Sequence, residues 1–471
     1  MLGIAFYTSR GASNESFFIG KKSSKWYLVA YGMIGTSLSG VTFMSVPGRV
    51  DANHFRYLQI VIGYVLGYIV VAKVLLPLYY RLNLTSIYTY LDERFGKTTH
   101  KTGAAFFLLS RTLGASLRIY LVLYVLQKFM MDEINVPFFF TTFIILLMIL
   151  LYTFKGGVKT IVWTDTLQTT FMVLALVMTI YLINSELKFS FGSLMSTLQD
   201  KDYTEMFSFD WKSKSFFLKQ IIGGAFITIA MTGLDQEMMQ KNISIRTLGE
   251  AQKNMYSFSA VLFLVNILFL ILGGALYVFA SAKNISLPAQ TDDIFPIVAL
   301  NYLPPVAGLV FIIGLISALF PSADGAMTAL TSSFCIDVLG FNERKDWSEE
   351  QKQQRRKLVH ISVAFIFLVI ILICKAINNK AIIDLVLDLA SYTYGPLLGL
   401  FMFGVLTKRK VTDKLVPVVC VLSPVLSFVL NLVSDKIIPG YYIGLELLLI
   451  NGLITFSGLY FISHKDFQTN I

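Results

Sequence analysis

The chain has 471 residues, of which 55 % are hydrophobic and only 14 % are charged, and its mean hydropathy is +0.67. Soluble domains carry about 25 % charged residues, so this composition excludes a soluble fold and predicts a polytopic α-helical membrane protein. The net charge of +10 does not indicate nucleic-acid binding, because Lys and Arg are concentrated in alternate connections between apolar segments, which is a topology signal.

Apolar segments long enough to cross about 30 Å of hydrocarbon recur along the whole chain. We predict twelve complete spans, which form a single transmembrane domain over residues 1–471. In chain order they cover residues 27–47, 56–80, 102–128, 135–154, 157–183, 215–236, 254–282, 305–339, 357–374, 381–406, 412–434 and 440–463. The polar connections around residues 184–214 and 340–357 are predicted to be loops.

The basic connections fix the expected orientation. Residues 20–25, 341–358 and 407–414 are rich in Lys and Arg, and the positive-inside rule makes them cytoplasmic. The C-terminus is then cytoplasmic too, and the expected location is the inner (plasma) membrane. The opening residues, MLGIAFYTSR, look like the last third of a span with a basic flank, the reverse of a secretory signal. We therefore expect residues 1–26 to hold a shortened first span and a cytoplasmic loop, which makes thirteen spans in a full-length protein.

Two predicted spans are rich in glycine and hydroxyl residues. One contains GMIGTSLSGVTFMSVPG (32–48) and the other IIGGAFITIAMTGLDQ (221–236). They open two groups of five spans, residues 27–183 and 215–406, with two C-terminal spans and a tail in 407–471. This arrangement predicts an inverted repeat with broken helices, whose freed carbonyl and amide groups bind a cation and a substrate at mid-membrane. Close helix packing through small residues is the alternative explanation of each segment alone.

Ionisable residues inside apolar runs are costly and usually face a cavity, a partner or a pathway. Arg111 and Arg118 are seven residues apart and so lie near one helical face; Asp165 and Asp324 are two further cases. A guanidinium at mid-bilayer needs an anion, and its planar fork fits a carboxylate. Alternatively, either arginine pairs with a protein carboxylate or binds a carbonyl of a broken helix. Asp324 has the alternative of a structural pair with a cytoplasmic-side Lys or Arg.

Several long stretches resemble the sodium:solute symporter family, in the family's order and across essentially the whole chain. They are TSIYTYLDERFG (85–96), GGVKTIVWTDTLQ (156–168), TGLDQEMMQKNISIRTLGEAQK (232–253), ALFPSADGAMTALTSSFCIDVLG (318–340) and GPLLGLFMFGVLTKR (395–409). The resemblance implies an all-α, LeuT-like core of two inverted five-helix repeats with flanking helices. It also implies a sodium-coupled secondary active symporter and not an enzyme.

The resemblance places a sodium site between the first and eighth core helices. Its implied ligands are the backbone carbonyls of Gly35, Leu38 and Ala318 and the hydroxyl of Ser322. Position 321, where the family usually has Ser or Thr, is Pro321 in this chain. A proline within a helix frees the carbonyl four residues earlier, here that of Ser317, and we hypothesise that backbone oxygen replaces the missing hydroxyl.

Two aspartates match family positions on the cytoplasmic side of that site. Asp165 of the WTD motif matches an aspartate that builds a second sodium site in some relatives, and Asp324 matches that of the common S-T-A-D-S pattern. We expect one sodium ion at the conserved site, with both carboxylates on its exit path. A second sodium ion at Asp165 is the alternative.

The expected substrate is a small carboxylate-bearing solute such as sialic acid. Sugar-transporting relatives use carboxylates and amides at positions that hold Thr42, Val61 and Thr228 here, which disfavours a neutral hexose. TSLSGVTFMSVPG (36–48) and RIYLVLYVL (118–126) instead resemble the branch that includes sialic acid transporters, where hydroxyls and an arginine hold a sugar acid. The implied substrate residues are Ser37, Ser39, Thr42, Gln59, Arg118 and Thr228.

Other functions remain as alternatives on the sequence alone. They are a sodium-coupled neutral sugar or amino-acid symporter and, from another class, a channel or a sensor. The sequence has no G-x-x-x-x-G-K-[ST] loop for an ATP-driven pump and no room for a soluble output domain. The expected partners are the substrate, sodium and the lipid bilayer, with no nucleic acid and no obligate protein partner.

Overall fold

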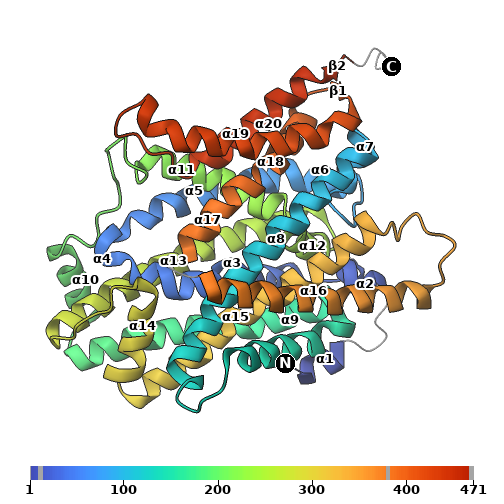
Figure 1. Cartoon of the computed structure of the whole chain (residues 1–471). Helices are drawn as coiled ribbons and strands as arrows, with labels where there is room; N and C mark the ends of the chain where they lie inside the picture. The colour runs from blue at the N-terminus through green and yellow to red at the C-terminus, as the bar shows by residue number, and fades with distance from the viewer. Residues whose placement is uncertain (1, 9–13, 378–381, 466–471) are drawn as a thin grey trace.

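The computed structural model describes residues 2–8, 14–377 and 382–465. The described chain is a bundle of long helices, most of which run from one end of the molecule to the other (Figure 1). Its one described sheet is a short antiparallel pair, β1 (Lys410–Val411) and β2 (Ser463–His464), which joins the segment before α19 to the end of α20.

Helices follow one another along almost the whole described chain. In order they are α1 (Leu2–Thr8), α2 (Asn14–Ile19), α3 (Trp26–Gly48), α4 (Val50–Asn53), α5 (Tyr57–Val70), α6 (Leu76–Arg81), α7 (Thr89–Arg94), α8 (Lys97–Leu126), α9 (Phe138–Leu187), α10 (Phe191–Asp200), α11 (Phe217–Thr228), α12 (Gln236–Ile243), α13 (Leu248–Ala282), α14 (Ile294–Ile297), α15 (Pro305–Ser333), α16 (Glu349–Ile377), α17 (Ile382–Thr393), α18 (Gly395–Leu406), α19 (Val416–Ile437) and α20 (Glu446–Phe461). Short 3-10 turns are η1 (Gly20–Lys22), η2 (His54–Arg56), η6 (Thr291–Asp293) and η9 (Asp413–Leu415), and π-helical turns are η3 (Val71–Leu75), η4 (Gln127–Met131), η5 (Ile229–Gly233), η7 (Val298–Tyr302) and η8 (Phe334–Val338).

Each of the twelve predicted spans coincides with a helix or a bent helix pair in the described residues. Eight helices are long and apolar enough to cross a membrane unaided. Two more spans are pairs bent at a short break, by 64° between η5 and α12 and by 43° between α17 and α18. The shorter apolar stretches Phe138–Phe154 and Glu446–Phe461 lie at the two remaining positions.

The element α9 contains two of the predicted spans. Its 50 residues are interrupted at Gly157, where φ is 52° and ψ is −140°. Residues with side chains rarely adopt this conformation, whereas glycine adopts it at little cost. A Cβ atom at this position would also lie 2.6 Å from the Cα atom of Phe17, so the turn between the two spans requires a glycine.

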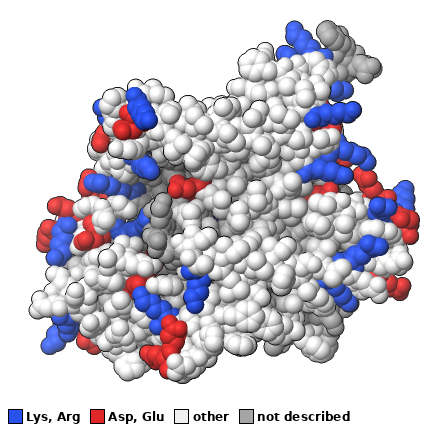
Figure 2. Space-filling view, in the orientation of Figure 1, with Lys and Arg blue, Asp and Glu red and all other residues white. Residues whose placement is uncertain are grey.

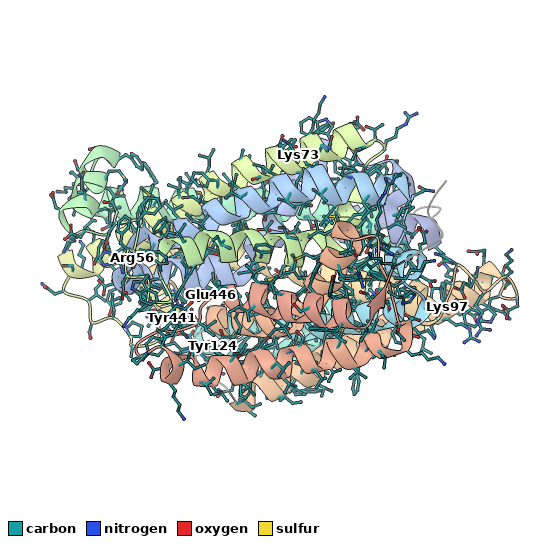
Figure 3. All side chains as sticks on the ribbon, turned by 90° about the horizontal axis from the view of Figure 1, so that it is seen from above. Arg56, Lys73, Lys97, Tyr124, Tyr441 and Glu446 are labelled. Carbon is teal, nitrogen blue, oxygen red and sulfur yellow. The ribbon has the colours of Figure 1, made fainter. Side chains whose placement is uncertain are left out.

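The surface agrees with a membrane location. Charged side chains gather toward the two ends of the face shown in Figure 2, and the band between them is almost free of charge. Arg56 and Lys97 lie near these opposite ends (Figure 3). Large apolar side chains of the outer helices are exposed, among them Leu151 of α9, Phe365 of α16 and Leu426 of α19. Lipid chains cover such a surface as favourably as a protein core does.

The prediction that residues 184–214 form only a loop was wrong. Helix α10 lies within this connection and packs against α13. Its buried residues, Leu194 and Leu198, are four positions apart and form one apolar side of an otherwise polar helix. The second predicted loop is shorter than expected, because α16 begins at Glu349.

The predicted breaks in the two glycine-rich spans are confirmed. In α3, Ser39 has φ 40° and ψ 172°, so the helix is interrupted at its centre. The other segment passes from α11 through η5 and then turns by 64° into α12. Helix α3 packs against α8, α9, α13 and α15, so its break lies inside the bundle. At the N-terminus, α1 packs against α9, where the hydroxyls of Thr8 and Thr160 are 2.7 Å apart.

Candidate functional site

A cavity of about 110 Å³ lies beside the break in α3. Its walls come from α3, α5, α8, α11, η5, α13 and α17, together with Met238 of α12. The cavity brings together five of the six residues predicted to bind substrate, which are Ser37, Ser39, Thr42, Arg118 and Thr228. Arg111 lines it as well, which confirms that the two arginines share a helical face.

Three tyrosines and an asparagine are among the lining residues that were not predicted from the sequence. Tyr57, Tyr64 and Tyr68 project from α5, and the hydroxyl of Tyr68 lies 3.5 Å from that of Ser37. Asn266 of α13 is buried; its amide nitrogen donates to the carbonyl of Leu262, whereas its Oδ1 has no hydrogen-bond partner among the described residues. The available signal for Asn266 was an amide within the apolar run VLFLVNILFLIL.

A larger cavity of about 470 Å³ adjoins the central one on the side of Arg56. Tyr57 and Leu387 line both cavities, so they form the boundary between them. The larger cavity is lined by Arg49, Arg56 and Lys214, with Asp388 on the opposing helix α17. It extends from the residues beside Arg56 to its boundary with the central cavity.

Gln59, the sixth predicted substrate residue, does not line the central cavity. It is buried in the wall of the larger cavity, and its side-chain amide is occupied by the protein. Nε2 donates to the carbonyls of Arg56 and Ser215 at 3.0 and 3.4 Å, and Oε1 accepts from the backbone N–H of Ser208 at 3.3 Å. The residue lies only two positions after the start of α5, so it ties the outer end of that helix to the following connection.

The two arginines of α8 have different partners. Arg111 is buried and forms an ion pair with Glu237, and its Nη1 atom lies 3.7 Å from Oδ2 of Asp235. Arg118 has no hydrogen bond or ion pair with any described residue, although its side chain lines the cavity. The sequence left open that either arginine pairs with a protein carboxylate. This alternative applies to Arg111. Arg118 presents an unpaired guanidinium to the cavity.

Helix α12 supplies charged residues that sequence reasoning missed. Asp235 caps its N-terminus and accepts hydrogen bonds from the N–H groups of Glu237 and Met238 and from the hydroxyl of Tyr394. All eight residues of α12 are buried. The predicted span ended at residue 236, so the polar run QEMMQK was assigned to a connection. Its i, i+4 spacing of Glu237 and Lys241 was the available signal.

Lys241 lies between the cavity and the predicted ion pathway. Its Nζ atom is 2.7 Å from Oδ2 of Asp165, 2.6 Å from the hydroxyl of Thr36 and 3.7 Å from Oε1 of Glu237. Thr36 also donates to Asp165 at 3.2 Å. Asp165, which is fully buried, retains one oxygen, Oδ1, with no hydrogen-bond partner among the described residues.

The four predicted sodium ligands lie on two helices that pack against each other. Gly35 and Leu38 belong to the half of α3 before its break, and Ala318 and Ser322 belong to α15. A Cβ atom at Gly35 would lie 3.4 Å from Cγ of Pro321, so the proline ring of α15 faces Gly35 of α3. Helix α15 continues through Pro321 without interruption, and the proline cannot donate to the Ser317 carbonyl.

Three buried side-chain oxygens of α15 have no hydrogen-bond partner among the described residues, which leaves them available to a cation. They are Ser322 Oγ, Asp324 Oδ1 and Thr328 Oγ1. Asp324 Oδ2 accepts from the hydroxyl of Tyr152 at 2.7 Å, and in the described chain this carboxylate makes no ion pair with a Lys or Arg. Hard oxygen ligands of this kind suit sodium.

Comparisons with known proteins agree with the fold and the motifs. The model of the sodium:solute symporter family matches residues 17–414. The sodium/sialic acid symporter NanT of Aliivibrio fischeri is 25 % identical over 422 residues, which are 87 % of this chain and 80 % of that protein. The sodium/sialic acid symporter SiaT of Proteus mirabilis is 25 % identical over 415 residues, which are 86 % and 82 % of the two chains.

A solved structure supports the same fold. The substrate-bound, outward-open structure of a Na⁺-coupled sialic acid symporter superposes with a TM-score of 0.82 at 22 % identity, covering 98 % of this chain and 94 % of that one. At this identity the match concerns the fold, an all-α core of two inverted repeats with flanking helices. The chain therefore belongs to the sodium:solute symporter family, and it is a sodium-coupled membrane symporter and not an enzyme.

Proposed function

We propose that this symporter imports a small carboxylate-bearing solute, such as sialic acid, across the inner (plasma) membrane. The observation that carries the proposal is the unpaired guanidinium of Arg118 in a cavity between broken helices. Arg118 is only partly exposed and lies within a membrane span, where a cation without a counter-charge is costly. A guanidinium binds a carboxylate through two parallel hydrogen bonds. The names of the relatives from A. fischeri and P. mirabilis support the same substrate class.

The remaining lining suits a polyhydroxylated acid. The hydroxyls of Ser37, Ser39, Thr42 and Thr228 donate to or accept from sugar hydroxyls, and Oδ1 of Asn266 accepts from an N–H or O–H group. The tyrosine rings of α5 pack against the carbon faces of the ring. The cavity is smaller than the roughly 300–1,000 Å³ typical of small-molecule sites, so the surrounding helices separate when a sugar acid binds.

The lining also distinguishes this solute from the alternatives. The central cavity has two arginines and, among its described lining residues, no Asp or Glu. A neutral sugar leaves Arg118 without a counter-charge. An amino acid satisfies Arg118 through its carboxylate but leaves its ammonium group without one. A monoanionic solute is therefore the best match to the charge of the cavity.

Sodium is the second transported species, and we place it between α3 and α15. The proposed ligands are the carbonyl oxygens of Gly35, Leu38 and Ala318 and the hydroxyl of Ser322, with a freed carbonyl before Pro321 in place of the hydroxyl usual at that position. An ion that bridges the two helices stabilises the outward-open state. Asp165 and Asp324, which lie within electrostatic reach of each other, then guide the ion toward the cytoplasm.

Transport follows from the two-repeat fold. Residues 27–183 and 215–406 are the proposed repeats, which rock about the central site, and residues 407–471 add two flanking spans and a cytoplasmic C-terminus. Each sodium ion that moves inward gains about 2.3 kcal/mol per 100 mV of membrane potential, in addition to its concentration gradient. The lipid bilayer is the proposed surrounding partner, and the mechanism requires no protein partner.

Uptake into proteoliposomes tests the proposed activity. Vesicles that contain the full chain are expected to accumulate radiolabelled N-acetylneuraminic acid above its external concentration only when sodium is higher outside. Equal sodium on both sides serves as the control and abolishes accumulation. A channel equilibrates the solute without accumulating it, so that result, or equal accumulation without sodium, contradicts the proposal.

Replacement of Arg118 tests the carboxylate contact. Arg118→Gln is expected to lower uptake of the acid by about 100-fold or more, because a bidentate charged contact contributes about 3 kcal/mol. Sodium binding, measured by thermal shift, is expected to stay within about twofold. Lys128→Gln is the matched control, because it removes a positive charge next to α8 that pairs with Asp293 at 2.5 Å outside the cavity. Unchanged uptake by Arg118→Gln rules out this contact.

Two substitutions at position 321 test the sodium ligand set. Pro321→Ala restores the N–H that pairs with the Ser317 carbonyl but adds no hydroxyl, so sodium affinity is expected to fall by about tenfold. Pro321→Ser supplies the hydroxyl and is expected to bind sodium more tightly than Pro321→Ala. Sodium titration of uptake gives both affinities. If Pro321→Ala has the sodium affinity of the unmodified protein, the freed carbonyl is not a ligand.

A further inference from the structure

A chain of alternating buried charges joins the substrate cavity to the proposed sodium region. Arg111 lines the cavity and pairs with Glu237 through Oε2. The other oxygen of Glu237, Oε1, lies 3.7 Å from Nζ of Lys241, and that ammonium contacts Asp165 at 2.7 Å. The four side chains are each at most 4 % exposed. Their charges run positive, negative, positive, negative from the cavity toward the ion pathway.

Each inner member of this chain is shared between two partners. Glu237 is shared by Arg111 and Lys241, and Lys241 is shared by Glu237 and Asp165. Atoms at both junctions have spare capacity, because Oε1 of Glu237 and Oδ1 of Asp165 have no hydrogen-bond partner among the described residues. A shift of Lys241 toward Glu237 therefore frees Asp165, and a shift toward Asp165 leaves Glu237 to Arg111.

Glu237 and Lys241, the two inner residues of the four-residue chain, contact neighbouring helices. Glu237 lies directly against α15, where a Cβ atom at Gly325 would be 2.7 Å from its Cδ atom. The ammonium of Lys241 also contacts the hydroxyl of Thr36, the residue after the proposed sodium ligand Gly35. The chain thus touches α3 and α15, the two helices between which sodium is proposed to bind.

We propose that Arg111, Glu237, Lys241 and Asp165 couple substrate binding to sodium binding. The inference rests on the proposed function and extends it to residues that contact neither Arg118 nor the proposed sodium ligands of α15. A substrate carboxylate beside Arg111 and Arg118 weakens the hold of Arg111 on Glu237. Glu237 then attracts Lys241, and Asp165 becomes available to a sodium ion. A sodium ion at Asp165 also displaces Lys241 toward Glu237. The shift of Lys241 is the same, but it starts from the sodium end of the four residues.

Charge balance makes this coupling positive. The substrate carboxylate and the sodium ion carry opposite charges and sit at opposite ends of the four residues, so they attract each other through a low-dielectric interior. The ion pairs between them polarise in the same sense. Each ligand therefore raises the affinity for the other by the same factor. Arg111, Glu237 and Lys241 act here as positioning residues.

The test is the effect of sodium on the affinity for the acid. Binding of N-acetylneuraminic acid to the purified full chain is measured by titration calorimetry with saturating sodium and with choline in its place. In the unmodified protein, sodium is expected to tighten binding by about 5-fold or more, within the usual range of coupling. In Glu237→Gln the effect of sodium on the affinity for the acid is expected to fall below about twofold. The reason is that position 237, in the middle of the four-residue chain, loses its charge.

Three further variants separate coupling from a structural role. Lys241→Arg keeps the charge and is expected to keep the sodium effect. The double variant Glu237→Gln/Lys241→Gln keeps the net charge of the protein, which favours its recovery in folded form. It is expected to lose the effect of sodium on the affinity for the acid. Glu446→Gln is the matched control, because Glu446 forms a partly buried ion pair with Lys219 at 3.5 Å outside the chain. It is expected to keep the sodium effect.

The outcomes distinguish the inference from the function on which it rests. An unmodified protein that binds no acid, with or without sodium, overturns both. An unmodified protein that shows the sodium effect, together with a Glu237→Gln or double variant that retains it in full, overturns the coupling chain alone. A purely structural role lowers the melting temperature of these variants and leaves the ratio of the two affinities unchanged.

Discussion

The organisation of this protein depends on one constraint, which is that a charge inside the bilayer needs a counter-charge or hydrogen-bonding oxygens. Insertion of a lone Arg, Lys or Asp at the centre of a membrane helix costs about 2.5–3.5 kcal/mol. Arg111 and Lys241 meet the constraint within the protein, through Glu237 and Asp165. Arg118 has no such partner among the described residues, and we propose that the carboxylate of the transported solute supplies the counter-charge in the cavity. The proposed substrate class thus follows from the arginine of α8 that makes no ion pair with a described residue.

Broken helices provide the complementary half of the site. The interruption of α3 at Ser39, which lies beside the central cavity, and the bend before α12 leave backbone groups without partners in their own helix. Pro321 has a similar effect within a continuous helix, because it frees one carbonyl without breaking α15. A cation that binds such oxygens satisfies them and joins helices from the two proposed repeats. We therefore propose that the same backbone features provide both the ion ligands and the mobility that transport requires.

The amino-acid sequence was sufficient to predict the helical spans and the two breaks, and its resemblance to the family identified five of the residues that line the central cavity. The spans and the breaks depend on hydrophobic length and on glycine and hydroxyl content, which are local properties. The helix α10 was missed because it is amphipathic and lies within a polar connection. Gln59 was placed in the substrate set by resemblance, but its amide is occupied by neighbouring backbone groups, and such pairing depends on tertiary contacts. The roles of Arg111 and Arg118 could not be separated for the same reason, since the partner of Arg111 is 126 positions away.

The most direct measurement of the central claim is an experimental structure of the full chain with sodium and N-acetylneuraminic acid bound. We expect the carboxylate of the acid to lie within hydrogen-bonding distance of the Arg118 guanidinium, in the cavity beside the break in α3. A structure in which the acid binds elsewhere, or binds in this cavity with its carboxylate away from Arg118, would contradict the claim.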